Sequence, residues 1–135
     1  MDPDAGALMR RARESLERAY APYSRFPVAA AVYDERGRLF TGVNVENVSF
    51  GLSMCAERVA IFAAIAAGAR RISAIAVASG AAEVLSPCGA CRQVIAEFAS
   101  ADTPVYCCAG ASEIRRWTVS ELLPSGFAAP QLRSP

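Results

Sequence analysis

Apolar and polar residues follow one another along this chain with two different periods, and the period predicts the elements. In the first twenty residues, apolar side chains recur every three or four positions between Arg and Glu, the spacing of one face of a helix. These apolar positions are Leu8, Met9, Ala12, Leu16, Ala19 and Tyr20. The Asp-Pro-Asp run at positions 2–4 suits the start of that helix, because proline is tolerated in a first turn.

The following segment predicts a hairpin and then a strongly apolar helix. Residues 27–33 and 38–44 have the composition of strands, and the Asp-Glu-Arg-Gly turn between them joins the two. Residues 55–67 are almost wholly apolar and predict a helix that ends before Gly68. Because a helix that is apolar on all sides is normally buried on all sides, we expect this one to be covered by a sheet and by another subunit.

Helices and strands continue to alternate in the second half of the chain. The predicted elements there are a strand at 72–78, a helix at 88–100, strands at 104–108 and 114–117, and a helical turn at 119–123. This alternation predicts a three-layer α/β architecture. With 135 residues, we expect a single domain that spans positions 1–135.

Composition narrows the possible chemistry and location. The chain has no His and no Lys, so histidine ligands, histidine bases and Schiff-base lysines are excluded. A net charge of +1 gives no reason to expect nucleic acid or anionic lipid as a partner. The apolar stretches are too short to span a bilayer, and the first twenty residues lack the apolar core of a signal peptide. Five cysteines, with a Cys-x-x-Cys pair among them, therefore indicate metal ligands in a cytoplasmic protein rather than disulfides.

Three of these cysteines have the pattern of a catalytic zinc site. Cys55 stands two residues before Glu57, and Cys88 and Cys91 follow 33 residues later in a Pro-Cys-Gly-Ala-Cys run. Three thiolates leave the fourth position of a tetrahedral zinc open for water, and Glu57 is close enough to move protons. Both segments stand at predicted helix starts, where we expect main-chain amides to point at the sulfurs and stabilise thiolates.

Two other interpretations of the cysteines remain open at this point. A closed structural site could recruit Cys107 or Cys108 as a fourth ligand, which would make the chain a non-catalytic zinc module. Alternatively, Cys107 and Cys108 are buried free cysteines, since both lie in an apolar predicted strand.

Longer blocks of sequence resemble a known enzyme family. Cys-Ala-Glu-Arg at 55–58, together with Ser-Pro-Cys-Gly-Ala-Cys-Arg-Gln at 86–93, is similar to the small cytidine deaminases of pyrimidine salvage. Three further blocks match in the right order, at 20–28, 42–47 and 121–127. The resemblance implies a three-layer α/β/α cytidine deaminase-like fold with a five-stranded mixed sheet. It also implies a homotetramer whose active sites are completed across subunits.

The resemblance assigns the reaction and the metal. It implies zinc-dependent hydrolysis of cytidine and 2′-deoxycytidine to the uridines, with release of ammonia. Cys55, Cys88 and Cys91 would bind one zinc ion per chain, Glu57 would shuttle protons between water and the pyrimidine, and Arg58 would hydrogen-bond the sulfurs.

The resemblance also assigns the substrate contacts. The Ala56 amide would hold the ring O2, Phe26 would pack on the base, and Asn44 with Glu46 would hold the ribose 3′-hydroxyl. Phe127 would come from a neighbouring subunit. By themselves, Asn44 and Glu46 would be read as turn and surface residues, Phe26 as a core residue and Phe127 as an anchor for the chain end.

Some features differ from the family pattern or leave the substrate open. Ala29 stands where Gly is common, and Phe50 stands where Tyr is frequent, which removes a hydroxyl near the expected interface. A deaminase of a modified cytosine nucleoside, such as blasticidin S, is the alternative enzyme. A polynucleotide deaminase is disfavoured because the chain has no basic patch.

Overall fold

A mixed sheet of five strands, in the order β2-β1-β3-β4-β5, forms the centre of the computed structural model, which describes residues 5–110 and 113–128. The strands are β1 (Val28–Asp34), β2 (Leu39–Val43), β3 (Ile72–Ser79), β4 (Pro104–Ala109) and β5 (Arg115–Thr118). Only the pair β3 and β4 is parallel among these; β1 pairs antiparallel with both β2 and β3, and β4 with β5. The predicted hairpin at 27–44 is confirmed as β1 and β2.

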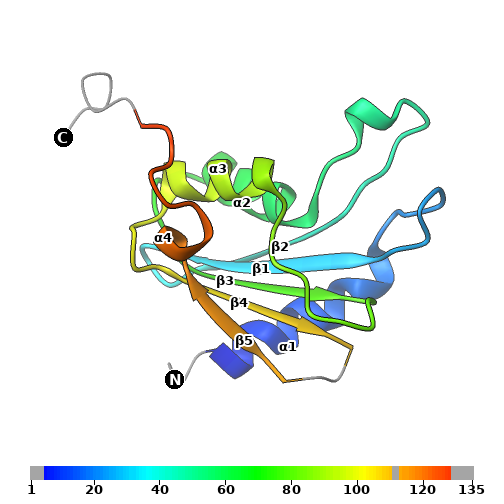
Figure 1. The fold of residues 1–135 in the computed structure, drawn as a ribbon, viewed down its shortest axis with the longest axis horizontal. Coiled ribbons are helices and arrows are strands. Elements are labelled where there is room, and N and C mark those ends of the chain that lie inside the picture. The colour runs from blue at the N-terminus through cyan, green and yellow to red at the C-terminus, as the bar shows by residue number, and fades with distance from the viewer. Residues whose placement is uncertain (1–4, 111–112, 129–135) are drawn as a thin grey trace.

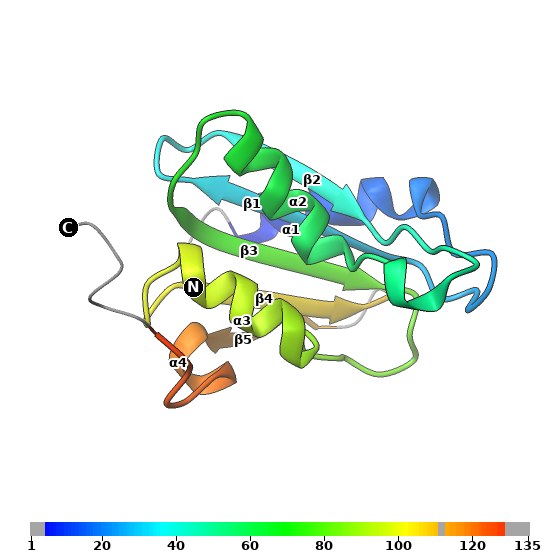
Figure 2. The same cartoon turned by 90° about the horizontal axis from the view of Figure 1, so that it is seen from above.

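Helices cover both faces of the sheet, as Figures 1 and 2 show. Helix α1 (Ala5–Ser15) lies on one face, while α2 (Ala56–Ala66) and α3 (Gly89–Phe98) lie side by side on the other. The short helix α4 (Val119–Leu122) follows β5 and starts with a capping box made by Thr118 and Glu121. The predicted three-layer α/β/α fold with a five-stranded mixed sheet is thereby confirmed.

Each face of the sheet has its own apolar core. Alternation along β4 shows the division, because Val105 and Cys107 pack in the cluster under α2 and α3, whereas Tyr106 and Cys108 pack in the cluster under α1. Helix α3 connects the parallel strands β3 and β4, so its N-terminus lies near the carboxyl end of β3. The N-terminus of α2 lies at the same edge, and this arrangement creates a place for a site.

One prediction about the helices needs correction. The first helix ends at Ser15 and is followed by a 3-10 turn at Leu16–Arg18, so Tyr20 leaves the helical face. Its main chain instead pairs with the segment after β2, through Tyr20 N to Asn44 O at 2.9 Å and Glu46 N to Tyr20 O at 2.9 Å. The predicted start of this helix at 2–4 lies outside the described residues.

Helix α2 is buried on one side in the single chain. Its Ala60 and Ile61 are fully buried, but the Phe62 side chain is 44% exposed and Ala63 is exposed as well. Because α2 belongs to the outer layer, the chain itself covers only the side that faces the sheet. Burial by the sheet is thus confirmed, and burial of the other side by a second subunit stays a prediction. In the part of the chain that is described, no helix is both long enough and apolar enough to cross a membrane.

Gly42 in β2 sets how closely α2 approaches the sheet. A Cβ atom at this position would lie 2.4 Å from Ala60 N and 2.7 Å from Ala56 O, both main-chain atoms that cannot rotate away. The absence of a side chain therefore lets the first turn of α2 rest directly on the end of β2. This contact brings the residues after β2 close to those that open α2.

We expect Gly42→Ala to destabilise the protein by about 3 kcal/mol, because overpacking against main chain forces the helix away from the strand. The measurement is urea unfolding at a fixed protein concentration. Gly51→Ala is the matched control, since nothing lies within 4 Å of a Cβ at that position, and its effect should stay within about 0.5 kcal/mol. Equal midpoints for the two variants would contradict the role of Gly42.

Candidate metal centre and binding pocket

Three cysteine sulfurs converge where the N-termini of α2 and α3 meet. Cys55 is the N-cap residue of α2, Cys88 is the N-cap residue of α3, and Cys91 lies in the first turn of α3. All three Sγ atoms lie within 4.8 Å of one another, and Cys55 Sγ is 3.8 Å from Cys88 Sγ. Sulfurs bound tetrahedrally to zinc at about 2.3 Å are about 3.8 Å apart. The predicted ligand set is therefore brought together with a spacing that suits zinc.

The charge of the cluster is balanced by Arg58 rather than by helix amides. Arg58 Nη2 donates to Cys55 Sγ at 3.3 Å, as expected for this residue. A hydrogen bond from Cys91, assisted by Arg58 and Cys88 and opposed by burial, lowers the pKa of Cys55 to about 5. Donation to Cys55 and burial raise the pKa of Cys91. The expected amide donors are not found, because neither Cys55 nor Cys88 makes a side-chain capping hydrogen bond.

The two remaining cysteines are not part of the cluster. Cys107 and Cys108 are buried on opposite faces of β4. Burial raises the pKa of Cys107 to about 12, so its sulfur stays a thiol at neutral pH. Among the described residues, the group able to hold a metal consists of Cys55, Cys88 and Cys91. This composition fits a zinc site with three protein ligands and an open fourth position.

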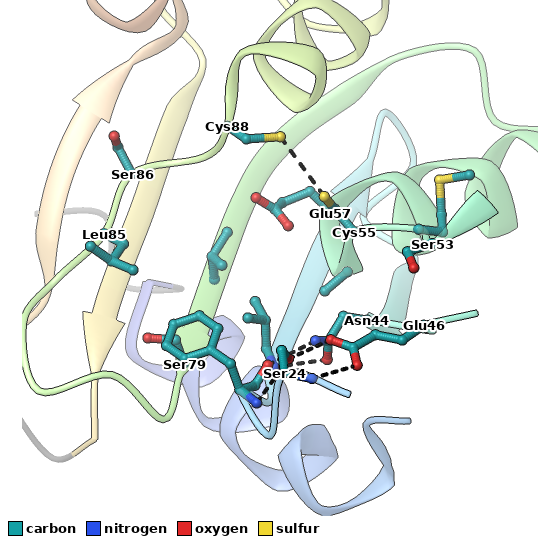
Figure 3. Close-up of a pocket in the computed structure, with 15 residues that line it drawn as sticks. Ser24, Asn44, Glu46, Ser53, Cys55, Glu57, Ser79, Leu85, Ser86 and Cys88 are labelled. Atoms are coloured by element: carbon teal, nitrogen blue, oxygen red, sulfur yellow. Dashed lines mark hydrogen bonds between the residues drawn. The ribbon is translucent and has the colours of Figure 1, made fainter. Parts of the chain in front are cut away.

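Glu57 lies beside the sulfurs and is almost completely buried. Its residue is 5% exposed, and it contributes to the lining of the same pocket as Cys55 and Cys88 (Figure 3). Burial raises the pKa of the Glu57 carboxyl above its ordinary value. A carboxyl group with a raised pKa next to a metal site is suited to accept and return protons.

A pocket of about 370 Å³ connects the sulfurs with the ends of β1 and β2. This volume falls within the range of small-molecule sites, about 300–1,000 Å³. Predicted site residues that line it are Phe26, Asn44, Glu46, Cys55, Ala56, Glu57 and Cys88. In Figure 3, Asn44 and Glu46 lie at one end of the pocket and Cys88 at the other. The lining thus has cysteine sulfurs at one end and the polar side chains of Asn44 and Glu46 at the other.

Asn44 and Glu46 organise the turn before β1 while they line the pocket. The Asn44 side chain accepts from Val28 N at 2.9 Å and donates to Phe26 O at 2.8 Å. Glu46 Oε1 accepts from the amides of Tyr23 and Ser24, both at 3.0 Å. These bonds hold residues 23–28 against the end of β2. The turn-forming role and the pocket-lining position are therefore combined in the same two side chains.

Three predicted site residues do not line the pocket. Cys91 is buried beneath it, and Arg58 contacts Cys55 from the side of α2. Phe127 is 78% exposed, and its carbonyl accepts from Gln93 Nε2 at 3.2 Å on α3. The described chain alone therefore offers no pocket contact for the Phe127 ring.

Sequence reasoning missed several pocket residues, among them Ser24, Leu85 and Ser86. Ser24 stood inside a matching block, and its place two residues before Phe26 in a turn was the available clue. Leu85 and Ser86 directly precede the Pro-Cys-x-x-Cys run, so proximity to a ligand was the clue there. Arg92 was also missed: it donates to Pro87 O at 2.7 Å and to Ser86 Oγ at 2.5 Å, which fixes the loop that leads to Cys88.

The two departures from the expected pattern are structurally mild. Ala29 is fully buried in β1, where it pairs with Val43 of β2, so its methyl group is accommodated within the sheet. Phe50 is 73% exposed, and its ring makes an edge contact with Tyr23 at 5.9 Å between centroids. Neither residue lines the pocket that contains Cys55 and Cys88.

Comparisons with known proteins agree with this site. A family model described as the cytidine and deoxycytidylate deaminase zinc-binding region matches residues 3–108. A cytidine deaminase of Halalkalibacterium halodurans is 46% identical over 129 residues, which covers 96% of this chain and 98% of that protein. A cytidine deaminase of Mycobacterium tuberculosis is 39% identical over 131 residues, covering 97% of this chain and 95% of that protein. The crystal structure of the Burkholderia pseudomallei cytidine deaminase is similar with a TM-score of 0.86, at 44% identity over 90% of this chain and 98% of that one.

The division of the cysteines can be tested by substitution. We expect Cys107→Ala and Cys108→Ala to retain about one zinc per chain, because neither sulfur belongs to the cluster. Cys88→Ala should lose most of the bound zinc, since it removes one of three ligands. The measurement is zinc per chain by atomic emission after dialysis. Loss of zinc from either β4 variant, with its fold intact by circular dichroism, would favour a closed four-cysteine site.

Proposed function

This chain belongs to the cytidine and deoxycytidylate deaminase family, and we propose that it hydrolyses cytidine and 2′-deoxycytidine to uridine and 2′-deoxyuridine with release of ammonia. The observation that carries this function is a three-cysteine cluster next to a buried carboxylate inside a pocket. That combination supports metal-assisted hydrolysis of a small molecule.

The chain's own residues provide ligands and proton transfer. Cys55, Cys88 and Cys91 would hold the zinc ion, which would supply the Lewis acidity that makes a water molecule nucleophilic. Glu57 accepts a proton from the attacking water and delivers a proton to N3 of the pyrimidine. As the C4–N4 bond breaks, Glu57 transfers the proton of the new C4 hydroxyl to the departing amine and the C4 carbonyl forms, so that water and cytidine become uridine and ammonia. Arg58 stays hydrogen-bonded to the Cys55 sulfur throughout the reaction, and its positive charge offsets the negative charge of that thiolate.

The other end of the pocket suits the sugar. Ala56 is the first residue of α2 and lines the pocket, so its amide is available for the ring O2. Phe26 offers a ring face for the base. Asn44 retains one N–H after its bond to Phe26 O, and Glu46 is an acceptor for the 3′-hydroxyl.

Two alternative substrates have to be distinguished from free cytidine. A modified cytosine nucleoside such as blasticidin S would use the same metal end, and a nucleotide would bring a phosphate into a pocket that contains the Glu46 carboxylate. Like charges disfavour the nucleotide. Initial rates on cytidine, 2′-deoxycytidine, 2′-deoxycytidylate and blasticidin S decide, and we expect the two free nucleosides to have the highest kcat/KM.

We further propose that the chain works as a single domain in a cytoplasmic homotetramer of pyrimidine salvage. Large apolar side chains that are exposed on one chain support association with other copies. They include Val48, Phe50, Leu52, Phe62, Leu85 and Phe127. Phe127 is exposed and lies outside its own pocket, which supports its use in the active site of a neighbour. Five free cysteines support a reducing compartment.

Glu57→Gln is expected to keep about one zinc per chain while kcat for cytidine falls by about a thousandfold. The amide preserves the shape of the carboxyl group but cannot accept and return the proton. Ultraviolet assay of cytidine loss, with zinc determined on the same samples, checks both parts. Glu14→Gln on the exposed surface of α1 is the control and should match the parent. Normal turnover by the Glu57 variant would exclude the proposed proton transfer.

Subunit sharing predicts complementation between two defective chains. Phe127→Ala should lower kcat/KM for cytidine about tenfold, because an aromatic contact with the base is lost. Co-expression of that chain with Glu57→Gln should restore activity above the sum of the parents, since random 1:1 mixing pairs an intact Glu57 with a neighbour's Phe127 in roughly a quarter of the sites. Activity equal to the average of the parents would mean that each chain completes its own site.

A further inference from the structure

A tight turn encloses the Glu46 carboxylate at the sugar end of the pocket. Residues 21–26 form this turn, in which Arg25 N donates to Ala21 O at 2.9 Å and Arg25 has a φ of 58°, in the left-handed region. The turn directs the amides of Tyr23 and Ser24 at Glu46 Oε1, both at 3.0 Å. A left-handed residue other than Gly is uncommon and is retained where surrounding contacts enforce it. Here the enforced shape is the one that binds Glu46.

Within this turn, the side chain of Ser24 forms hydrogen bonds both to Glu46 and to the main chain of the turn. Its hydroxyl donates to Glu46 Oε2 and accepts from Phe26 N at 3.0 Å (Figure 3). The Ser24 hydroxyl thus holds two groups in place. One is the Glu46 carboxylate, which is proposed to contact the sugar, and the other is the main chain of Phe26, whose ring is proposed to pack on the base. Ser24, Phe26 and Glu46 all line the pocket.

Counting acceptor positions shows what remains for a ligand. An ionised carboxylate has about four lone-pair positions, two on each oxygen. Oε1 of Glu46 is filled by two amides, and Oε2 receives the Ser24 hydroxyl, so one position on Oε2 stays free. The hydrogen bonds from Ser24 and Tyr23 lower the pKa of Glu46, which keeps it ionised and acceptor-only at neutral pH.

We propose that Ser24 is a positioning residue that holds Glu46 Oε2 as an acceptor for one neutral hydroxyl donor, and thereby makes the enzyme require a free 3′-hydroxyl on the sugar. This inference rests on the proposed function, in which Glu46 meets that hydroxyl. Without the Ser24 hydroxyl, the two amides still hold Oε1, but nothing in the turn fixes the direction of Oε2. Because Ser24 is exposed in the chain, its hydroxyl serves to orient the Glu46 carboxylate rather than to fill space in the core.

The test compares cytidine with 3′-deoxycytidine, which lacks only the hydroxyl in question. Steady-state kinetics are measured on the zinc-loaded full chain for the parent, Ser24→Ala and Ser24→Thr. For cytidine, Ser24→Ala should raise KM about tenfold and leave kcat within about threefold, because a hydrogen bond to a charged group is lost from binding. For 3′-deoxycytidine, parent and Ser24→Ala should have the same kcat/KM within about threefold.

Rescue separates the hydroxyl from the shape of the side chain. Ser24→Thr keeps a hydroxyl that can accept from Phe26 N and donate to Glu46, so its KM for cytidine should return to within about threefold of the parent. Ser49→Ala is the matched control: Ser49 is exposed in the same region, lies outside the pocket and makes no side-chain cap for its 3-10 turn. Zinc per chain and the melting temperature should be equal in all four proteins.

Each contrary result has its own meaning. An equal loss of kcat/KM on both nucleosides after Ser24→Ala, or a Thr variant as weak as the Ala variant, overturns the inference and leaves the proposed function intact. A parent enzyme that uses both nucleosides equally well overturns the Glu46 contact, and the inference falls with it. A zinc-loaded parent without activity on cytidine overturns the proposed function itself.

Discussion

Crowding of three sulfur atoms at the meeting point of two helices is the constraint on which the site depends. Cys55, Cys88 and Cys91 place their Sγ atoms within 4.8 Å of one another, and three thiolates at that distance repel strongly. The hydrogen bond from Cys91 to Cys55 lowers the pKa of Cys55 and raises that of Cys91. A divalent cation bound by the three sulfurs would offset most of the repulsion between the thiolates, and the positive charge of Arg58 would offset the single negative charge that remains. The topology places the start of α3 near the carboxyl end of β3, because α3 connects β3 to the parallel strand β4, and the cysteines at the starts of α2 and α3 then bring their sulfurs together.

Much of the frame could be predicted from the sequence because its local patterns agree with its tertiary contacts. Every predicted strand is present, and Gly68, with a φ of 103°, ends α2 as expected. Tyr20 shows the limit: it has the right spacing for a helix face, yet two main-chain bonds to the segment after β2 hold it elsewhere. Helical periodicity describes one segment, whereas the end of a helix also depends on a partner distant in sequence.

The candidate site was predictable at its metal end and less so at its sugar end. Cysteine spacing identifies ligands directly, because thiolates and zinc require one another. Ser24 acts through its hydroxyl on a carboxylate 22 residues away, and no periodicity or spacing encodes that contact. Arg92 is similar, since its guanidinium joins Ser86 and Pro87 to the Leu122 carbonyl of α4. Residues of this kind become visible only when the chain is folded.

The missing side chain at Gly42 has a consequence for how this frame can change its substrate. The distance between the metal end and the sugar end is fixed by main chain lying on main chain, with Ala60 N only 2.4 Å from where a Cβ would stand. A side chain added at that contact would push α2 away from β2 and destabilise the protein, so the spacing cannot be changed there without loss of stability. We therefore expect a related enzyme that accommodates a longer or bulkier nucleoside to differ in the segments at 45–53 and 80–87, which border the pocket and lie outside the strands of the sheet. The contact between β2 and α2 keeps the length of the pocket constant, and we expect differences in substrate size to come from the two loop segments that line it.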